Sequence, residues 1–313
     1  MIRITDLRKA YGTHVAVDGV TFDIATTETF GLLGPNGAGK STTIHMLVGA
    51  LRPDSGQIEI DGIPDPTRKE SRRVIGIAPQ ASALYEELTG YENLRFFARL
   101  YGLSGAKLTQ RVRWSLEFVG LLDRAGDIVR HYSGGMKRRL NIAAAVIADP
   151  KVIMLDEPTV GVDPQSRNHM FDNIEQLKRD GKTIIYTTHY MEEAQRLCDR
   201  VAIMDHGRIL AIDTVEELIA RHGGHSVVEV ELAPGNHPPA GLGPSLQVIP
   251  PGDNKRGGLE VDHGGTLLRI DTSTPDDEVT KLMQSRVRFT ALQIHRPDLE
   301  SVFLNLTGRR LRD

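Results

Sequence analysis

Short apolar runs alternate with amphipathic segments along the first two-thirds of the chain. The apolar runs predict buried strands at 29–33, 74–78, 152–155, 183–187 and 201–205. Between them, apolar positions at helical spacing predict helices at 42–51, 92–101, 108–119, 137–148, 165–180 and 192–198. Short apolar strands that are separated by helices favour a largely parallel α/β sheet.

The pattern changes near residues 222–225, where the chain reads His-Gly-Gly-His. Beyond this point the sequence predicts strands at 227–232, 259–262, 267–271 and 288–295, and helices at 275–284 and 298–306. Segments rich in proline and glycine at 234–244 and 250–258 predict loops. We therefore expect an α/β domain over residues 1–222 and a small α+β domain over residues 224–313.

Composition narrows the class of protein. Of the 313 residues, 40% are hydrophobic and 25% are charged, which excludes a mostly disordered chain. The formal net charge of -3 disfavours a general nucleic-acid binder, and we expect no nucleic-acid partner. A lone Cys198 excludes an intrachain disulfide and a Cys-based zinc site, and we interpret it as a small apolar filler.

Apolar stretches in the chain are short. The longest uninterrupted ones, such as 143–148, fall far below the roughly 20 residues that span a bilayer. The N-terminal residues 1–6 also lack a basic segment followed by a long apolar segment. We therefore expect no signal peptide and no membrane crossing by this chain alone.

A glycine-rich turn follows the predicted strand 29–33 and precedes a predicted helix. It consists of Gly34, Pro35, Asn36, Gly37, Ala38, Gly39, Lys40 and Ser41, which match the P-loop pattern. Glycine lets the backbone approach phosphate oxygens, and the amides at the helix start point toward the anion. Lys40 is then placed to reach the β- and γ-phosphates, and Ser41 to offer a hydroxyl to Mg²⁺. Residues 254–257, Asn-Lys-Arg-Gly, lack the Asp of a guanine-reading motif, so guanine specificity is disfavoured.

Acidic and basic candidates stand at the ends of two other predicted strands. The apolar run at 152–155 leads into Asp156 and Glu157. We expect Asp156 to orient Mg²⁺ and Glu157 to polarise the attacking water. His189 follows the strand at 183–187, and the carboxyl ends of parallel strands line the ligand crevice of such folds. His189 is therefore a candidate to reach the γ-phosphate or the water.

A second Ser-Gly-Gly motif, Ser133-Gly134-Gly135, stands before the predicted helix at 137–148, between Tyr132 and Met136. Two interpretations are open. In the first, Ser133 caps the helix while the glycines form a turn. Alternatively, this helix start meets the phosphate of a nucleotide that is held elsewhere, for example on a second copy of the chain.

Taken together, these motifs resemble the nucleotide-binding domain of ABC transporters over about residues 1–221. The resemblance rests on the order P-loop, Gln80, Ser-Gly-Gly, Asp156-Glu157, Asp163 and His189. It implies a P-loop ABC-type fold with a helical insert at about 81–132. By this resemblance, Tyr11 stacks on adenine, and the Walker A residues with the adjacent Thr42 bind the nucleotide. Gln80 contacts Mg²⁺ and water, Glu157 is the catalytic base, and His189 is the switch histidine. Asp163 belongs to the D-loop, and the signature motif contains Ser133, Gly134 and Gly135.

The same resemblance implies partners. In that family two domains sandwich two ATP molecules head to tail, so a second copy of this chain is expected. The string Tyr-Ser-Gly-Gly-Met, residues 88–94 and the tail at 297–308 are similar to the branch of daunorubicin-resistance ATPases and of polysaccharide or lipo-oligosaccharide exporters. This implies an ATPase at the cytoplasmic membrane face that powers a separate permease, an exporter of drugs, lipids or other hydrophobic compounds.

Three points stay open at this stage. A soluble ABC ATPase that assembles or remodels a complex is the alternative function. The C-terminal domain is interpreted either as a dimer-stabilising appendage or as a regulatory module. Aromatic residues of the insert form its core, or a groove for a coupling helix of the permease: Tyr85, Phe96, Phe97, Tyr101, Trp114 and Phe118.

Overall fold

The computed structural model describes residues 1–233, 235–239, 245–249, 255–256, 259–260, 266–285 and 287–309. Within these residues the chain forms two compact units, Met1–Leu218 and Ile219–Arg309. The division falls inside α8 (Val215–His222), just before the boundary that the sequence suggests. No helix among the described residues is both long and apolar enough to span a membrane.

A six-stranded sheet forms the centre of the first unit, in the order β5-β6-β7-β3-β8-β9. Its strands are β3 (Thr29–Leu33), β5 (Ile75–Ala78), β6 (Val152–Asp156), β7 (Thr183–Thr188), β8 (Arg200–Asp205) and β9 (Arg208–Asp213). All neighbours are parallel except β8 and β9. Every residue of β3, β6 and β7 is buried, which explains why these strands read as continuous apolar runs. The predicted α/β fold is confirmed.

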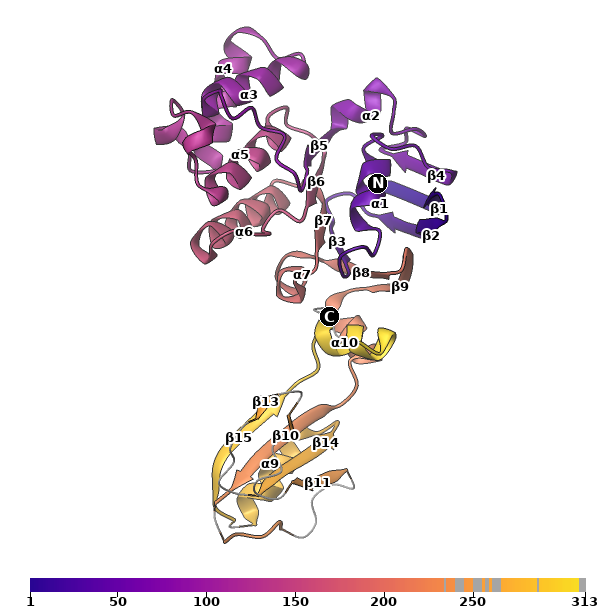
Figure 1. Ribbon diagram of the computed structural model, residues 1–313, viewed down its shortest axis with the longest axis vertical. Helices are drawn as coiled ribbons and strands as arrows, with labels where there is room; N and C mark the ends of the chain where they lie inside the picture. The colour runs from indigo at the N-terminus through magenta and orange to yellow at the C-terminus, as the bar shows by residue number, and fades with distance from the viewer. Residues whose placement is uncertain are drawn as a thin grey trace. The chain divides into compact units, whose positions relative to one another are not determined.

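A second, antiparallel sheet of the first unit was not predicted. Its order is β2-β1-β4, with β1 (Ile2–Tyr11), β2 (His14–Ile24) and β4 (Ser55–Ile60). Its buried face joins the central core, where Phe22 of β2 stacks on Phe30 of β3 with ring centroids 4.9 Å apart. Helix α1 (Lys40–Leu47) contacts both β2 and β6. Figure 1 shows α1 beside this indigo sheet, with the helices of the insert on the other side of the central strands.

Helices cover the rest of the first unit. They are α2 (Lys69–Val74), α3 (Gly90–Leu100), α4 (Gly105–Phe118), α5 (Gly134–Val146), α6 (Pro164–Arg179) and α7 (Met191–Leu197), with 3-10 turns at Leu122–Arg124 and Val129–His131. α3, α4 and α5 pack on one another. All six predicted helices of this unit begin one to three residues earlier than predicted. At α5 the difference is three residues, because Ser133 caps a first turn whose two glycines resemble a loop in the sequence.

Aromatic side chains of the insert form two groups. Tyr85, Phe96 and Phe97 meet mainly edge to face, and Tyr85 stays 49% exposed. Trp114 stacks on Phe118 at the far end of α4. Most of these rings pack against one another, but none of the six predicted aromatic residues is fully buried. The buried apolar side chains of α3 and α4 are instead Leu94, Ala98, Leu108, Val112 and Leu116.

The second unit is α+β, as predicted. An antiparallel sheet has the order β11 (Leu246–Ile249), β14 (Leu267–Thr272), β10 (Ser226–Leu232) and β15 (Phe289–His295). Helix α9 (Pro275–Gln284) packs on β10 and β14, and α10 (Leu299–Thr307) follows. A small ladder joins β12 (Lys255–Arg256) to β13 (Leu259–Glu260). Residues 261–262 of the predicted strand, and most of both predicted loops, lie outside the described residues.

Candidate active site

The glycine-rich turn between β3 and α1 needs glycine at two positions for steric reasons. A Cβ at Gly34 would stand 2.1 Å from the carbonyl oxygen of Met204. Gly39 has φ of +105°, and a Cβ there would stand 2.4 Å from the carbonyl oxygen of Ala16. The turn is therefore pressed against β8 and β2, and its backbone can approach a ligand closely.

Lys40 opens α1 with its side chain turned back over the turn. Its ammonium donates hydrogen bonds to the carbonyl oxygens of Gly34 at 2.7 Å and Pro35 at 3.0 Å. It also forms an ion pair with Glu157, with 3.0 Å between Nζ and Oε1. Both side chains are almost completely buried. A buried charge pair is tolerated only where hydrogen bonds satisfy the remaining donors, which the two carbonyls do here.

Asp156 ends β6 beside the first turn of α1. Its Oδ1 atom accepts hydrogen bonds from Ser41 Oγ at 3.2 Å and from Thr187 Oγ1 at 2.6 Å. Only 1% of Asp156 is exposed. The carboxylate is thus held by hydroxyl groups of two neighbouring elements and faces the start of α1.

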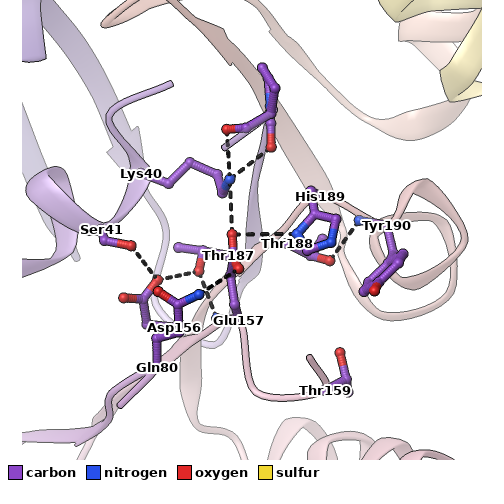
Figure 2. Close-up of polar contacts among 12 residues, drawn as sticks. Lys40, Ser41, Gln80, Asp156, Glu157, Thr159, Thr187, Thr188, His189 and Tyr190 are labelled. Carbon is purple, nitrogen blue, oxygen red and sulfur yellow. Dashed lines mark hydrogen bonds and ion pairs between the residues drawn. The ribbon is translucent and has the colours of Figure 1, made fainter. Parts of the chain in front are cut away.

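Glu157 lies at the centre of the polar cluster in Figure 2. Its backbone has φ of +46°, a left-handed conformation that is rare outside glycine. The amide of Glu157 donates to Thr187 Oγ1, and its Oε2 atom accepts a hydrogen bond from Gln80 Nε2 at 3.0 Å. His189 Nδ1 lies 3.5 Å from Oε1 of the same carboxylate. The left-handed turn directs the side chain toward these partners instead of across the sheet.

Sheet order explains why distant segments meet here. The strands β5, β6, β7 and β3 are consecutive neighbours, and Gln80, Glu157, His189 and the glycine-rich turn follow them in that order. The carboxyl ends of these parallel strands therefore form one edge, where ligands of open α/β sheets bind.

A cavity of about 540 Å³ opens at this edge. It is lined by Tyr11, His14, Ala16, Asn36, Gly37, Gly39, Lys40, Ser41, Thr42, Gln80, Glu157, Val160 and His189. Gly34, Pro35, Ala38 and Asp156 support this cavity without lining it. His14, Ala16 and Val160 were not predicted. Tyr11 and β2 are joined by a tight hairpin, and side chains two residues apart in a strand lie on the same face. That alternation places His14 and Ala16 on one face of β2 and is the signal that could have identified them.

Ser133, Gly134, Gly135 and Asp163 meet one another away from the cavity. Ser133 caps α5 through Met136 N, and Asp163 caps α6 by accepting from Ser166 N at 2.8 Å. This hydrogen bond lowers the pKa of the Asp163 carboxyl. A Cβ at Gly135 would stand 2.3 Å from Ser166 Oγ. The starts of α5 and α6 are therefore packed together, and none of the four residues Ser133, Gly134, Gly135 and Asp163 lines the cavity.

Relatives of known class match the whole chain. The linearmycin resistance ATP-binding protein LnrL of Bacillus subtilis (strain 168) is 44% identical over 321 aligned positions, covering 100% of both chains. The chain belongs to the ABC transporter family. A sequence profile described as ABC transporter also matches residues 17–160 of this ABC protein. The Nod factor export ATP-binding protein I of Cupriavidus metallidurans is 41% identical, covering 100% of this chain and 99% of its own.

Solved structures agree with that assignment. The ATP-binding subunit of an ABC transporter matches 71% of this chain and 93% of its own, at 34% identity and a TM-score of 0.65. A dimeric post-hydrolysis state of an ATP-binding cassette, bound to ADP and Pi, matches 68% of this chain at 25% identity and a TM-score of 0.64. The ABC protein described here is an ATP-binding subunit that hydrolyses ATP, of the exporter type.

Proposed function

We propose that this ABC protein hydrolyses Mg²⁺-ATP between two copies of itself and thereby powers export through a separate membrane permease. One observation carries the proposal. The cavity at the glycine-rich turn is lined by Gln80, Glu157, His189 and residues of the turn and the start of α1, whereas Ser133, Gly134 and Gly135 do not line it. A single copy therefore carries two complementary halves of a site.

Within one copy, the proposed roles follow from the contacts. Tyr11, 51% exposed at the cavity rim, offers its ring to the adenine. Lys40 and the amides of the turn bind the β- and γ-phosphates. Ser41 and Asp156, already joined by a hydrogen bond, supply the hard oxygen ligands that Mg²⁺ prefers, with Gln80 as a third. The ion, when bound, neutralises charge on the phosphate oxygens.

Glu157 is the proposed general base for the attacking water. Its carboxylate is 4% exposed and is held between Gln80 and His189, the two side chains that follow the flanking strands. A carboxylate at the γ-phosphate edge can take a proton from water as the phosphorus–oxygen bond forms. His189 is the proposed switch that contacts the γ-phosphate.

Ser133, Gly134 and Asp163 are proposed to complete the site of the second copy. Ser133 and Gly134 are exposed, and no acidic residue stands in the first turn of α5, so its amides can meet the phosphate of another chain. Dimeric cassettes are among the matching structures. The names of two relatives, which refer to linearmycin resistance and to Nod factor export, support an export role. Drugs, lipids or other hydrophobic compounds as the cargo, and the cytoplasmic membrane face as the location, belong to the same proposal.

The test of dimerisation uses Glu157→Gln, which keeps the shape of the side chain and removes the base. With Mg²⁺-ATP this variant is expected to run as a stable dimer in size exclusion with light scattering. Lys40→Ala is the matched control and is expected to stay monomeric, because its phosphate affinity is lost. A Glu157→Gln variant that hydrolyses ATP at the wild-type rate would refute the assignment of the base.

Membrane partners are tested separately. The tagged wild-type chain is purified from detergent-solubilised membranes of its host, and bound chains are identified by mass spectrometry. A polytopic protein in stoichiometric amount supports the proposed permease. Recovery of soluble partners alone, under conditions that keep a control transporter intact, would contradict it and favour a complex-remodelling ATPase.

A further inference from the structure

One buried carboxylate of the first unit has no part in the roles proposed above. Glu193 lies on α7, four residues after His189 in the sequence, and only 2% of it is exposed. Burying a carboxylate is costly unless donors compensate it. An apolar residue at this position of α7 would pack without that cost, so the charge needs an explanation.

Three hydroxyl groups satisfy this carboxylate, and they come from two separate segments. Thr159 Oγ1 donates to Glu193 Oε1 at 2.7 Å. Tyr186 OH and Thr188 Oγ1 donate to Oε2 at 2.9 and 2.8 Å. Burial and the nearby Glu193 charge raise the pKa of the Tyr186 phenol well above its ordinary value, which keeps that donor protonated.

These donors stand next to the proposed catalytic groups. Thr159 follows Glu157 in the loop that leads to Asp163, and Thr188 immediately precedes His189. Thr188 Oγ1 also accepts from the amide of Tyr190, so the hydroxyl fixes the backbone on the other side of His189. Figure 2 shows Thr188 and Tyr190 flanking His189, with Thr159 on the loop that continues from Glu157.

A cation of helix α6, Arg167, lies near the Glu193 carboxylate. Arg167 of α6 lies 4.0 Å from Glu193 Oε1, measured from its Nε, and its guanidinium stands 5.4 Å from the centre of the Tyr190 ring. α6 begins at the residue after Asp163. The same carboxylate thus accepts a hydrogen bond from the loop before Asp163, lies near a cation of the helix after it, and reaches the backbone around His189 through the Thr188 hydroxyl.

We propose that Glu193 is a positioning residue for ATP hydrolysis, which holds the Thr159 loop and the His189 segment in one fixed arrangement. The proposal rests on the proposed function, since it acts through Glu157 and His189. Loss of the carboxylate uncouples the two segments and leaves the phosphate-binding turn unchanged.

The experiment compares Glu193→Gln with Glu192→Gln, an exposed neighbour on the same helix. Steady-state hydrolysis of Mg²⁺-ATP by the full chain is measured over a range of ATP concentrations. Glu193→Gln is expected to lower kcat about tenfold with KM changed less than about twofold, since sub-ångström misplacement of reacting groups affects the chemical step. Glu192→Gln is expected to match the wild type in both constants.

A second pair of variants tests the hydrogen bond itself. Thr159→Val replaces the donating hydroxyl by a methyl group, whereas Thr159→Ser keeps it. Valine is expected to lower kcat with KM unchanged, and serine to restore it. In the Glu193→Gln background, Thr159→Val is expected to add little further loss, because both changes break the same contact. Additive losses would indicate two independent structural effects and overturn the proposal.

The remaining outcomes are also decisive. Wild-type kcat in a folded Glu193→Gln variant would overturn the proposal, as would equal changes in kcat and KM. If Glu193→Gln does not fold, Thr159→Val decides, and a wild-type kcat there overturns the proposal. Glu157→Gln is measured in the same assay: undiminished activity of that variant would refute the proposed function, whereas its loss of activity beside a wild-type kcat in Glu193→Gln would overturn the positioning role alone.

Discussion

Two glycine-rich helix starts of this protein, at α1 and at α5, are the proposed phosphate-binding elements, yet their surroundings differ. At α1 the N-cap is Gly39, no side chain caps the helix, and a buried lysine and a cavity stand in front of it. At α5 the Ser133 hydroxyl caps the helix, and the surface around it is exposed. The first start thus faces a cavity within one copy, whereas the second is capped by its own side chain and exposed, as the proposed contact with another chain requires.

The largest effect is expected from two variants, one changed at the start of α1 and one at the start of α5, that are assayed separately and then mixed. Lys40→Ala removes the phosphate-binding ammonium, and Gly134→Asp sets a carboxylate at the start of α5. Each variant is expected to lose about 100-fold of its ATPase rate, because an electrostatic partner of the phosphates is lost or repelled. Mixed in equal amounts, they are expected to recover at least about tenfold, since a head-to-tail pair then contains one site without either change.

Gly134→Ser is the matched control for the mixing experiment. A Cβ at Gly134 meets only the carbonyl oxygen of Gly161, at 4.0 Å, so a small uncharged side chain fits. Its rate is expected to stay well above that of Gly134→Asp. If mixing restores no activity, the two helix starts do not complement each other between two copies.

A smaller effect is expected from a change at Ser41, a proposed Mg²⁺ ligand in the first turn of α1. Ser41→Ala removes a hydroxyl that contacts Asp156 and is expected to raise the Mg²⁺ concentration for half-maximal activity about tenfold. The measurement is a Mg²⁺ titration of ATPase rate at fixed ATP. Ser55→Ala, an exposed serine on β4, serves as control and should leave the titration unchanged. An unshifted midpoint in Ser41→Ala would remove Ser41 from the metal site.

The smallest effect concerns the cap of α5. Ser133→Ala removes a hydroxyl that accepts from Met136 N and is expected to lower the free energy of unfolding by about 1 kcal/mol. Urea unfolding followed by circular dichroism measures it. Ser104→Ala is matched, because Ser104 precedes α4 without a side-chain cap hydrogen bond, and no change is expected. Equal losses in both variants would mean that the Ser133 cap does not stabilise α5.

Much of the central sheet could be predicted because its strands are buried on both faces and read as apolar runs. The antiparallel sheet could not, because β1 is irregular. Its register shifts between Ile4 and Leu7, and Asp6 takes φ of +45°. The shift changes the spacing of buried residues from two to three, so the alternation that marks a strand is interrupted. In the second unit, β11 has only four residues, which is too short for an alternation of apolar and polar positions to predict a strand.

Residues of the candidate site were predictable where their chemistry is contiguous in sequence, as in the turn at 34–41. Their convergence was not, because it depends on the order of strands in the sheet, which a single sequence does not contain. Thr187 shows the difference. Its hydroxyl contacts both Asp156 and the amide of Glu157, yet in sequence it is one polar residue at the end of an apolar strand.

The left-handed backbone of Glu157 has a consequence for engineering. A residue other than glycine in this conformation costs about 1–3 kcal/mol. Glycine would relieve that strain, and asparagine would reduce it, but neither brings a carboxylate to the cavity. A library screened for heat resistance alone would therefore enrich sequences that lack the proposed base at this position. Thermostable forms of this ATPase need a selection that counts turnover together with survival.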